Sequence, residues 1–245
     1  MFVHEPTAEY QNTPKPSGIE ALTPARALVV ELVRRYGVLG FECSHLEVQK
    51  LAWFLGCGVR RAGLPDPLAL QFTAHQYGPY SDQLRHVLNA LDGSYLHCDH
   101  RIAEASPFEP IWFEPAQRAK VAIYLQSPAA CDYLPALEWT AALIDGFESP
   151  LGMELLATVD WLRHEAGVAP TVAAVRAGVA RWPGGRSAAQ GKQRIFDDHM
   201  LGLALEHLRK ADAVGPAAGA SGFDRENRSP APEICSALHE SLQDS

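Results

Sequence analysis

The segment YGPY at residues 77–80 contains the residue types that most directly suggest a binding surface. Gly78 can adopt backbone conformations closed to other residues, and Pro79 fixes φ, so the turn is expected to be rigid. Tyr77 and Tyr80 could contact a partner, or they could only pack beside the turn as a strand leads into a helix. The sequence shows no adjacent nucleophile and base here, so a catalytic pocket is not predicted.

A helix is predicted to begin directly after this turn. Ser81 is a favourable N-cap residue, and an acidic residue at position 82 suits the positive end of a helix. Apolar residues at positions 84, 87, 88 and 91 have the spacing of one buried face, which leaves the neighbouring polar residues outside it. We therefore predict a partner-binding surface that contains Tyr77, Tyr80, Asp82, Arg85 and His86.

An acidic segment supplies the second group of candidate residues. Residues 121–162 contain no Lys, Arg or His, whereas residues 163–210 contain eight basic residues against four acidic ones. Gly146 fits a helix C′ position and Ser149 the next N-cap, so the segment DGFES could be only a joint between helices. Because the surrounding stretch without basic residues also permits a basic partner, we add Asp145, Glu148 and Glu154 to the predicted partner-binding residues.

Two further segments could bind a metal ion or a phosphate, and both are interpreted as loops. LHCDH at residues 96–100 places metal-ligand types side by side, but adjacent residues rarely reach one ion at good angles. Residues 181–194 form a basic segment without the Lys-Ser/Thr ending of a P-loop, and a flexible loop is predicted there. We therefore expect no metal site, no cofactor and no catalytic residue.

The elements that must position these residues are mainly helices. The fold class predicted is mainly α: a compact multi-helix domain with a short minor β element, formed by the alternating residues 69–74. Residues 1–17 are predicted to be an N-terminal arm or linker, residues 18–215 the helical domain, and residues 216–245 a disordered tail. Helices are expected to start at the cap-plus-proline pair 23–24 and at the capping box 44–47, and to cover about 81–91, 116–126, 132–145, 150–166, 171–181 and 195–211.

Composition limits the class of protein. The 245 residues carry a formal charge of −8, which disfavours direct binding to DNA because nucleic-acid binders need a basic surface. Five widely spaced cysteines without a CxxC motif are typical of reduced thiols. The N-terminus resembles no secretory signal and apolar runs stop short of a membrane span, so we expect a cytoplasmic protein that does not contact a membrane.

Three segments together resemble the C-terminal domain of DarG-type antitoxins, within the SocA-like antitoxin group. They are LEVQKLAWFLG at residues 46–56, YGPYSDQLRHVLNALDGSYL at 77–96 and LIDGFESPLGMELLATVDWL at 143–162. The resemblance covers roughly residues 20–215. It implies a DarT-type toxin as partner, an enzyme that ADP-ribosylates single-stranded DNA, which the antitoxin would neutralise by occupying the toxin's DNA site.

The family's ADP-ribose-removing macrodomain has no counterpart in this sequence, and LHCDH replaces a Gly/Tyr-rich turn of the family. The resemblance thus predicts a non-enzymatic antitoxin that acts by DNA mimicry. One alternative is an adaptor that interacts with a protease and delivers a toxin to it. The other is a winged-helix-like DNA-binding autoregulator formed by the last, basic helices.

Overall fold

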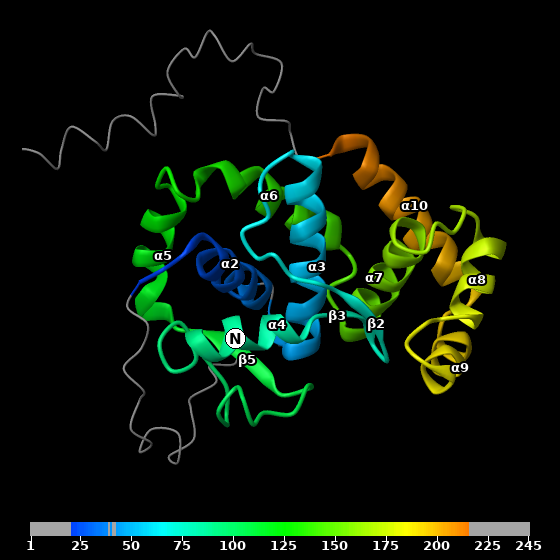
Figure 1. Ribbon diagram of the computed structural model, residues 1–245, viewed down its shortest axis with the longest axis horizontal. Coiled ribbons are helices and arrows are strands. Elements are labelled where there is room, and N and C mark those ends of the chain that lie inside the picture. The colour runs from blue at the N-terminus through cyan, green and yellow to red at the C-terminus, as the bar shows by residue number, and fades with distance from the viewer. Residues whose placement is uncertain (1–20, 39, 41–42, 216–245) are drawn as a thin grey trace, which may run out of the picture.

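Helix α3 (His45–Arg61) lies at the centre of the fold and packs against helices on several sides. Figure 1 shows α3 between α2 and α7 in the computed structural model, which describes residues 21–38, 40 and 43–215. The helix begins with the predicted capping box: the Ser44 side chain accepts a hydrogen bond from the backbone N–H of Leu46, and the Ser44 N–H donates to Glu47. Every residue from 45 to 56 is buried, so the polar side chains of α3 must find partners inside the protein.

The prediction of a mainly α fold is confirmed. Around α3 lie α2 (Pro24–Val38), α4 (Asp82–Leu91), α5 (Arg118–Leu125), α6 (Leu134–Ile144), α7 (Pro150–His164), α8 (Val172–Ala180), α9 (Arg186–Ile195) and α10 (Asp198–Val214). Short 3-10 turns η1 (Pro115–Gln117) and η2 (Cys131–Tyr133) precede α5 and α6. Side-chain caps hold the starts of α7 and α8 as predicted, because Ser149 accepts from Gly152 N–H and Thr171 from Ala174 N–H.

The β structure is small and antiparallel. Strands β1 (Cys43–Ser44), β5 (Pro110–Phe113) and β4 (Leu96–His97) form a three-stranded sheet in that spatial order. Strands β2 (Thr73–His75) and β3 (Gly78–Tyr80) form a hairpin in which His75 pairs with Gly78. The YGPY segment is therefore the turn and second strand of a hairpin, and β3 packs against both α3 and α7. The strand expected over residues 69–74 is shorter and begins later than predicted.

Two predicted loops have more structure than the sequence suggested. The basic segment 181–194, expected to be flexible, contains most of α9, and Trp182 before it donates a hydrogen bond from Nε1 to the His75 carbonyl oxygen at 2.8 Å. The expected solvated loop 96–100 begins in strand β4, where His97 is buried and Cys98 is completely buried. The burial of the second segment arises from tertiary contacts: His97 stacks on Trp112, and Cys98 donates to a carboxylate oxygen of Glu109.

The turn before α4 is held by a side chain of α3 rather than by its own cap. Ser81 N–H donates to Gln49 Oε1 at 2.9 Å, and Gln49 Nε2 donates to the Ser81 carbonyl oxygen at 3.0 Å. The Ser81 side chain makes no cap hydrogen bond, so the prediction that it caps α4 is wrong. The two bonds to Gln49 fix the position of the hairpin and of α4 relative to the central helix.

Other expectations concern features beyond the helices. The four cysteines within the described ranges are free thiols. No helix in the described part of the chain is long and apolar enough to cross a membrane. The predicted arm at residues 1–17 and the predicted tail at 216–245 lie outside the described residues.

Replacing Gln49 by leucine should destabilise the protein, because the buried Ser81 N–H loses its partner and the Ser81 carbonyl oxygen keeps only its hydrogen bond from the Leu84 N–H. An unsatisfied buried group costs about 1–3 kcal/mol, so we expect a loss of about 1–3 kcal/mol in the free energy of unfolding, measured by urea denaturation. The matched control Gln190→Leu, at an exposed position of α9, should change it by less than about 0.5 kcal/mol. Equal effects of the two substitutions would contradict the assignment of this role to Gln49.

Candidate functional site

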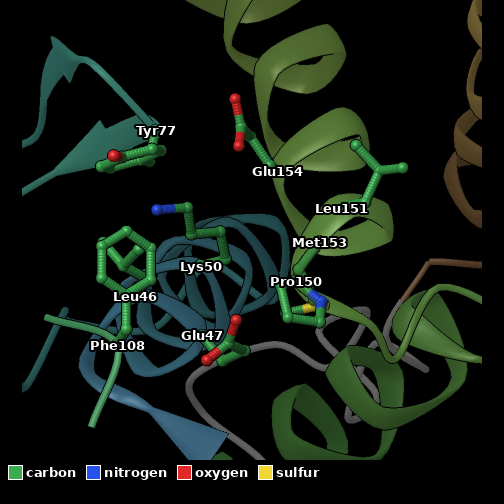
Figure 2. Close-up of a pocket in the computed structure, with 9 residues that line it drawn as sticks. All are labelled: Leu46, Glu47, Lys50, Tyr77, Phe108, Pro150, Leu151, Met153 and Glu154. Atoms are coloured by element: carbon green, nitrogen blue, oxygen red, sulfur yellow. The ribbon is translucent and has the colours of Figure 1, made fainter. Parts of the chain in front are cut away.

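A pocket of about 170 Å³ lies where α3, the β2–β3 hairpin and the start of α7 meet. Figure 2 shows its lining: Leu46, Glu47, Lys50, Tyr77, Phe108, Pro150, Leu151, Met153 and Glu154. All of these except Phe108 come from the three separate sequence segments 46–56, 77–96 and 143–162. The fold therefore brings the three most distinctive segments of the sequence to one cavity.

Lys50 is the most unusual residue of this pocket. Its side chain is only 2% exposed, and Nζ has no hydrogen-bond partner among the described residues. In Figure 2 the ammonium group points into the space between Tyr77, Phe108 and Glu154. A buried ammonium normally has a partner, because removing a charge from water costs several kcal/mol. Lys50 is therefore a donor available to an incoming group.

Gly78 of the YGPY turn makes room for this lysine. Its φ of +106° lies in the region that favours glycine, and a methyl group placed there would lie 3.3 Å from Lys50 Cε. The turn motif thus has a packing function that the sequence interpretation did not include: it brings the backbone against the lysine stem. The same turn places the Tyr77 side chain at the pocket.

A buried ion pair lies beside the pocket. Lys192 of α9 donates to Glu154 Oε1 at 2.5 Å and to Thr158 Oγ1 at 3.2 Å, and its Nζ lies 5.0 Å from the ring centre of Trp182. Glu47, in turn, accepts the Ser44 N–H of the capping box at 2.8 Å. Both pocket carboxylates thus have partners in the protein, whereas the Lys50 ammonium has none.

Burial governs the ionisation of both lysines. It lowers the pKa of Lys50 to about 7, a shift that Lys192 reinforces and that Glu154 and Glu47 oppose. The pKa of Lys192 is also lowered by burial, against the opposing effect of the Glu154 carboxylate. A lysine that exchanges its proton near neutral pH can act as an acid or a base, and such shifts are concentrated at functional sites.

The mouth of the pocket is aromatic and apolar. The rings of Tyr77 and Phe108 meet edge to face with centroids 5.4 Å apart, and Phe108 is 60% exposed. Leu151 at the start of α7 is also exposed, while Met153 is buried in the wall. The volume is well below the roughly 300–1,000 Å³ of pockets that enclose a drug-sized ligand. The pocket is therefore suited to one flat or apolar group that brings a hydrogen-bond acceptor to Lys50.

The predicted partner-binding residues divide among four places. Tyr77 and Glu154 line the pocket. Tyr80 is not among the residues that line the pocket: its ring meets His45 edge to face and lies tilted against His75, and burial raises the pKa of Tyr80. The pKa of His45 is lowered to about 4 by its burial and by the nearby charges of Arg85 and Lys50.

The remaining predicted residues do not line the pocket. Asp82, Arg85 and His86 are exposed on α4, whereas Asp145 and Glu148 lie in the joint between α6 and α7. No observation on the described residues tests whether any of the eight contacts a partner. Their part in partner binding stays a prediction.

Sequence reasoning missed Lys50, Phe108 and Lys192. A signal for Lys50 was present, since apolar residues stand four positions before it and three and four positions after it, which places it on a second apolar face of the helix. No sequence signal joins Phe108 or Lys192 to this site, because they come from a loop and from a helix remote in the chain.

The acidic segment does not present an array of free carboxylates. Asp160 is buried and accepts a hydrogen bond from Trp53 Nε1 at 2.8 Å, Glu154 pairs with Lys192, and Glu138 pairs with Arg35 at 2.7 Å. Asp132 also accepts from the Cys131 thiol at 3.9 Å, so four of the six carboxylates in this segment make contacts within the protein. A surface that imitates DNA phosphates needs such groups free for a partner, so the geometry gives DNA mimicry little support.

Comparison with known proteins gives relatives that share one name. The chain is 34% identical over 205 residues to proteins of Mycobacterium tuberculosis and Mycobacterium bovis, and 35% identical over 196 residues to one of Thermus aquaticus. Each is named DNA ADP-ribosyl glycohydrolase. The matches cover 78–80% of this chain but 49–54% of the relatives, so the chain spans about half the length of the curated relatives it matches. No family model matches the chain.

These names correct the predicted function. The relatives are named for an enzyme that removes ADP-ribose, so the expectation of a non-enzymatic, macrodomain-lacking antitoxin acting by DNA mimicry is wrong. The protease adaptor and the DNA-binding autoregulator are wrong for the same reason. The absence of enzymatic activity was inferred from missing sequence elements. The chain spans only about half the length of its relatives. Sequence elements that it lacks therefore say nothing about enzymatic activity.

Replacing Lys50 by methionine should stabilise the protein at neutral and acidic pH, because a buried ammonium without a hydrogen-bond partner is removed. We expect a gain of about 1–4 kcal/mol in the free energy of unfolding at pH 6. Below pH 7 both folded and unfolded wild type carry this proton, so the full cost of burial is present. Between pH 7 and the ordinary value of 10.5 only the unfolded state keeps the proton, so wild type should gain stability relative to the variant as the pH rises.

Urea denaturation of both proteins from pH 6 to pH 10 measures this difference. The exposed control Lys210→Met should follow wild type at every pH. A constant difference between Lys50→Met and wild type across this range would show that Lys50 does not change its proton there.

Proposed function

We propose that this chain acts in the removal of ADP-ribose from DNA, as a DNA ADP-ribosyl glycohydrolase. One observation carries the proposal: 34–35% identity over about four fifths of the chain to proteins of that name. The pocket also supports this proposal, because three segments distant in sequence meet around Lys50, whose ammonium has no hydrogen-bond partner among the described residues.

The pocket holds the two kinds of group that cleavage of a glycosidic bond needs. In such cleavage water attacks the anomeric carbon of the sugar and loses a proton to solvent, while an acid protonates the leaving group and a carboxylate stabilises the positive charge developing on the sugar. Lys50, with its pKa lowered to about 7 by burial, is suited to donate the proton, since an acid is most effective near the working pH. Glu154 is the carboxylate, held in place by its ion pair with Lys192.

A second candidate is favoured by the length of the match. The chain spans about half of its relatives, so it could supply the DNA-binding half of the enzyme while the cleaving residues lie in the half it does not span. Under this alternative Lys50 and the aromatic mouth still contact DNA but do not act on the bond. The toxin partner implied by the resemblance remains a separate prediction, to be tested by mixing purified toxin with this chain.

Release of ADP-ribose from an ADP-ribosylated single-stranded oligonucleotide is the direct test. We expect the purified chain to release it, and Lys50→Met and Glu154→Gln to lower kcat by about 100-fold or more, the usual contribution of a positioned acid or base. Lys210→Met and Glu104→Gln, at exposed positions, should retain the wild-type rate. If the chain binds the oligonucleotide without releasing ADP-ribose, the second candidate holds. If it does neither, both candidates fail.

A further inference from the structure

We propose that Lys50 is a nucleophile that forms a Schiff base with a small, uncharged aromatic aldehyde bound in its pocket. The proposal goes beyond the proposed function, because it concerns a covalent reaction of the lysine itself and needs neither DNA nor ADP-ribose. Three features of the described residues carry it: an amine without a partner, carboxylates beside that amine, and an aromatic entrance.

The first feature is the free amine of Lys50. Its side chain is 2% exposed, and Nζ has no hydrogen-bond partner among the described residues. Lys192 is buried as deeply, but its Nζ donates to Glu154 and Thr158, and the Glu154 carboxylate favours the protonated form of Lys192. A lysine attacks a carbonyl carbon through the lone pair of its neutral amine, so Lys50 is the better nucleophile of the two.

Burial makes this neutral amine available near pH 7. Because burial lowers the pKa of Lys50 to about 7, roughly half of the molecules carry a neutral Lys50 at that pH. A lysine with the ordinary pKa of 10.5 is neutral in only about one molecule in three thousand at pH 7. Desolvation in an apolar pocket and a neighbouring cation, here Lys192, are two established ways of activating a lysine for attack on a carbonyl group.

The second feature is the pair of carboxylates in the lining, Glu47 and Glu154, both of which favour positive charge on Lys50. When the Lys50 lone pair attacks the aldehyde carbon, the π electrons of the carbonyl group move to its oxygen, and a proton passes from nitrogen to that oxygen. The hydroxyl group so formed takes up a second proton and leaves as water, while the nitrogen lone pair forms the C=N bond. A lysine ammonium and an aldehyde thus become a protonated imine and water, with the positive charge conserved.

Glu154 is the group suited to carry these protons. In Figure 2 the Lys50 ammonium points into the space between Tyr77, Phe108 and Glu154, which is where the aldehyde carbon would have to lie. A carboxylate beside the reacting nitrogen can accept its proton and return it to the departing oxygen. The charge of the protonated imine stands where the ammonium stood, so Glu47 and Glu154 stabilise the product as they stabilise the ammonium.

The third feature is the entrance, which limits the class of aldehyde. The rings of Tyr77 and Phe108 lie 5.4 Å apart, and together with Leu46 and Leu151 they offer apolar walls to a flat ring. A volume of about 170 Å³ suits a single ring better than a drug-sized ligand. An aldehyde that also carries a carboxylate would bring negative charge close to Glu47 and Glu154, so an uncharged aldehyde is favoured.

Reductive trapping tests the proposal. The probe is benzaldehyde, and sodium cyanoborohydride delivers a hydride to the imine carbon, which leaves a stable benzylamine on the reacted lysine. The sequence contains only five lysines, so mass spectrometry of the peptides measures the rate at each position: 15, 50, 120, 192 and 210. Because the comparison is made within the wild-type chain, it does not depend on the folding of a variant.

At pH 7 we expect Lys50 to be benzylated at least about tenfold faster than Lys192 and than the exposed Lys120 and Lys210. This preference should disappear in urea that unfolds the protein, because it depends on burial. Lys50→Met should lose the fast reaction, whereas the control Lys210→Met should keep it. Glyoxylate, an anionic aldehyde, should react with Lys50 at least about tenfold more slowly than benzaldehyde, when both rates are divided by the rate at Lys210.

Three results would overturn the proposal. Equal rates at Lys50 and Lys210 in the folded wild type would show that Lys50 is not an activated nucleophile. A fast reaction that persists in Lys50→Met would assign the reactive amine to another position. Glyoxylate that reacts with Lys50 as readily as benzaldehyde would refute the preference for an uncharged aldehyde.

Measuring ADP-ribose release on the same preparations separates this proposal from the proposed function. Trapping at Lys50 without release of ADP-ribose would refute only the cleavage. Release of ADP-ribose without trapping at Lys50 would refute only the Schiff base.

Discussion

The rest of the structure depends on one constraint: helix α3 is buried on all sides over residues 45–56. With residues 45–56 all inside, each polar side chain of this helix either finds a partner or carries a cost. Glu47 closes the capping box, and Gln49 binds both backbone groups of Ser81. Lys50 alone among these three has no partner, and the hairpin and α7 are arranged around it. The position of the pocket thus follows from the polar residues of a helix that has no solvent-facing side over this length.

The two buried lysines show how similar groups can have different roles. Lys192 is held by Glu154, Thr158 and the face of Trp182, which is the environment of a structural ion pair linking α9 to α7. Lys50 lies under Gly78 with its ammonium unsatisfied. A buried ammonium without a hydrogen-bond partner is difficult to explain by stability, because an apolar side chain of similar size would fill the same space at lower cost. A functional contact is the simplest reason for keeping it.

The comparison and the geometry bear on function in different ways. The relatives are named for removal of ADP-ribose from DNA, but they are about twice as long as the matched region. The geometry, by contrast, concerns only this chain, and it identifies one recess whose chemistry needs an acceptor group.

Much of the architecture was determined by the sequence itself. Cap-plus-proline pairs, the capping box at 44–47 and the apolar period of 3.6 residues predicted most helices to within a few residues, because these signals act over one or two turns of the chain. The site was decided only by tertiary structure. Three contacts that form it join residues distant in sequence. Gln49 binds the Ser81 N–H in place of a side-chain cap, Lys192 of α9 pairs with Glu154, and Phe108 contacts Tyr77. The acidic segment looked like a free charged surface for the same reason: a carboxylate's partner, such as Trp53 for Asp160, lies about a hundred positions away, and only packing brings the two together.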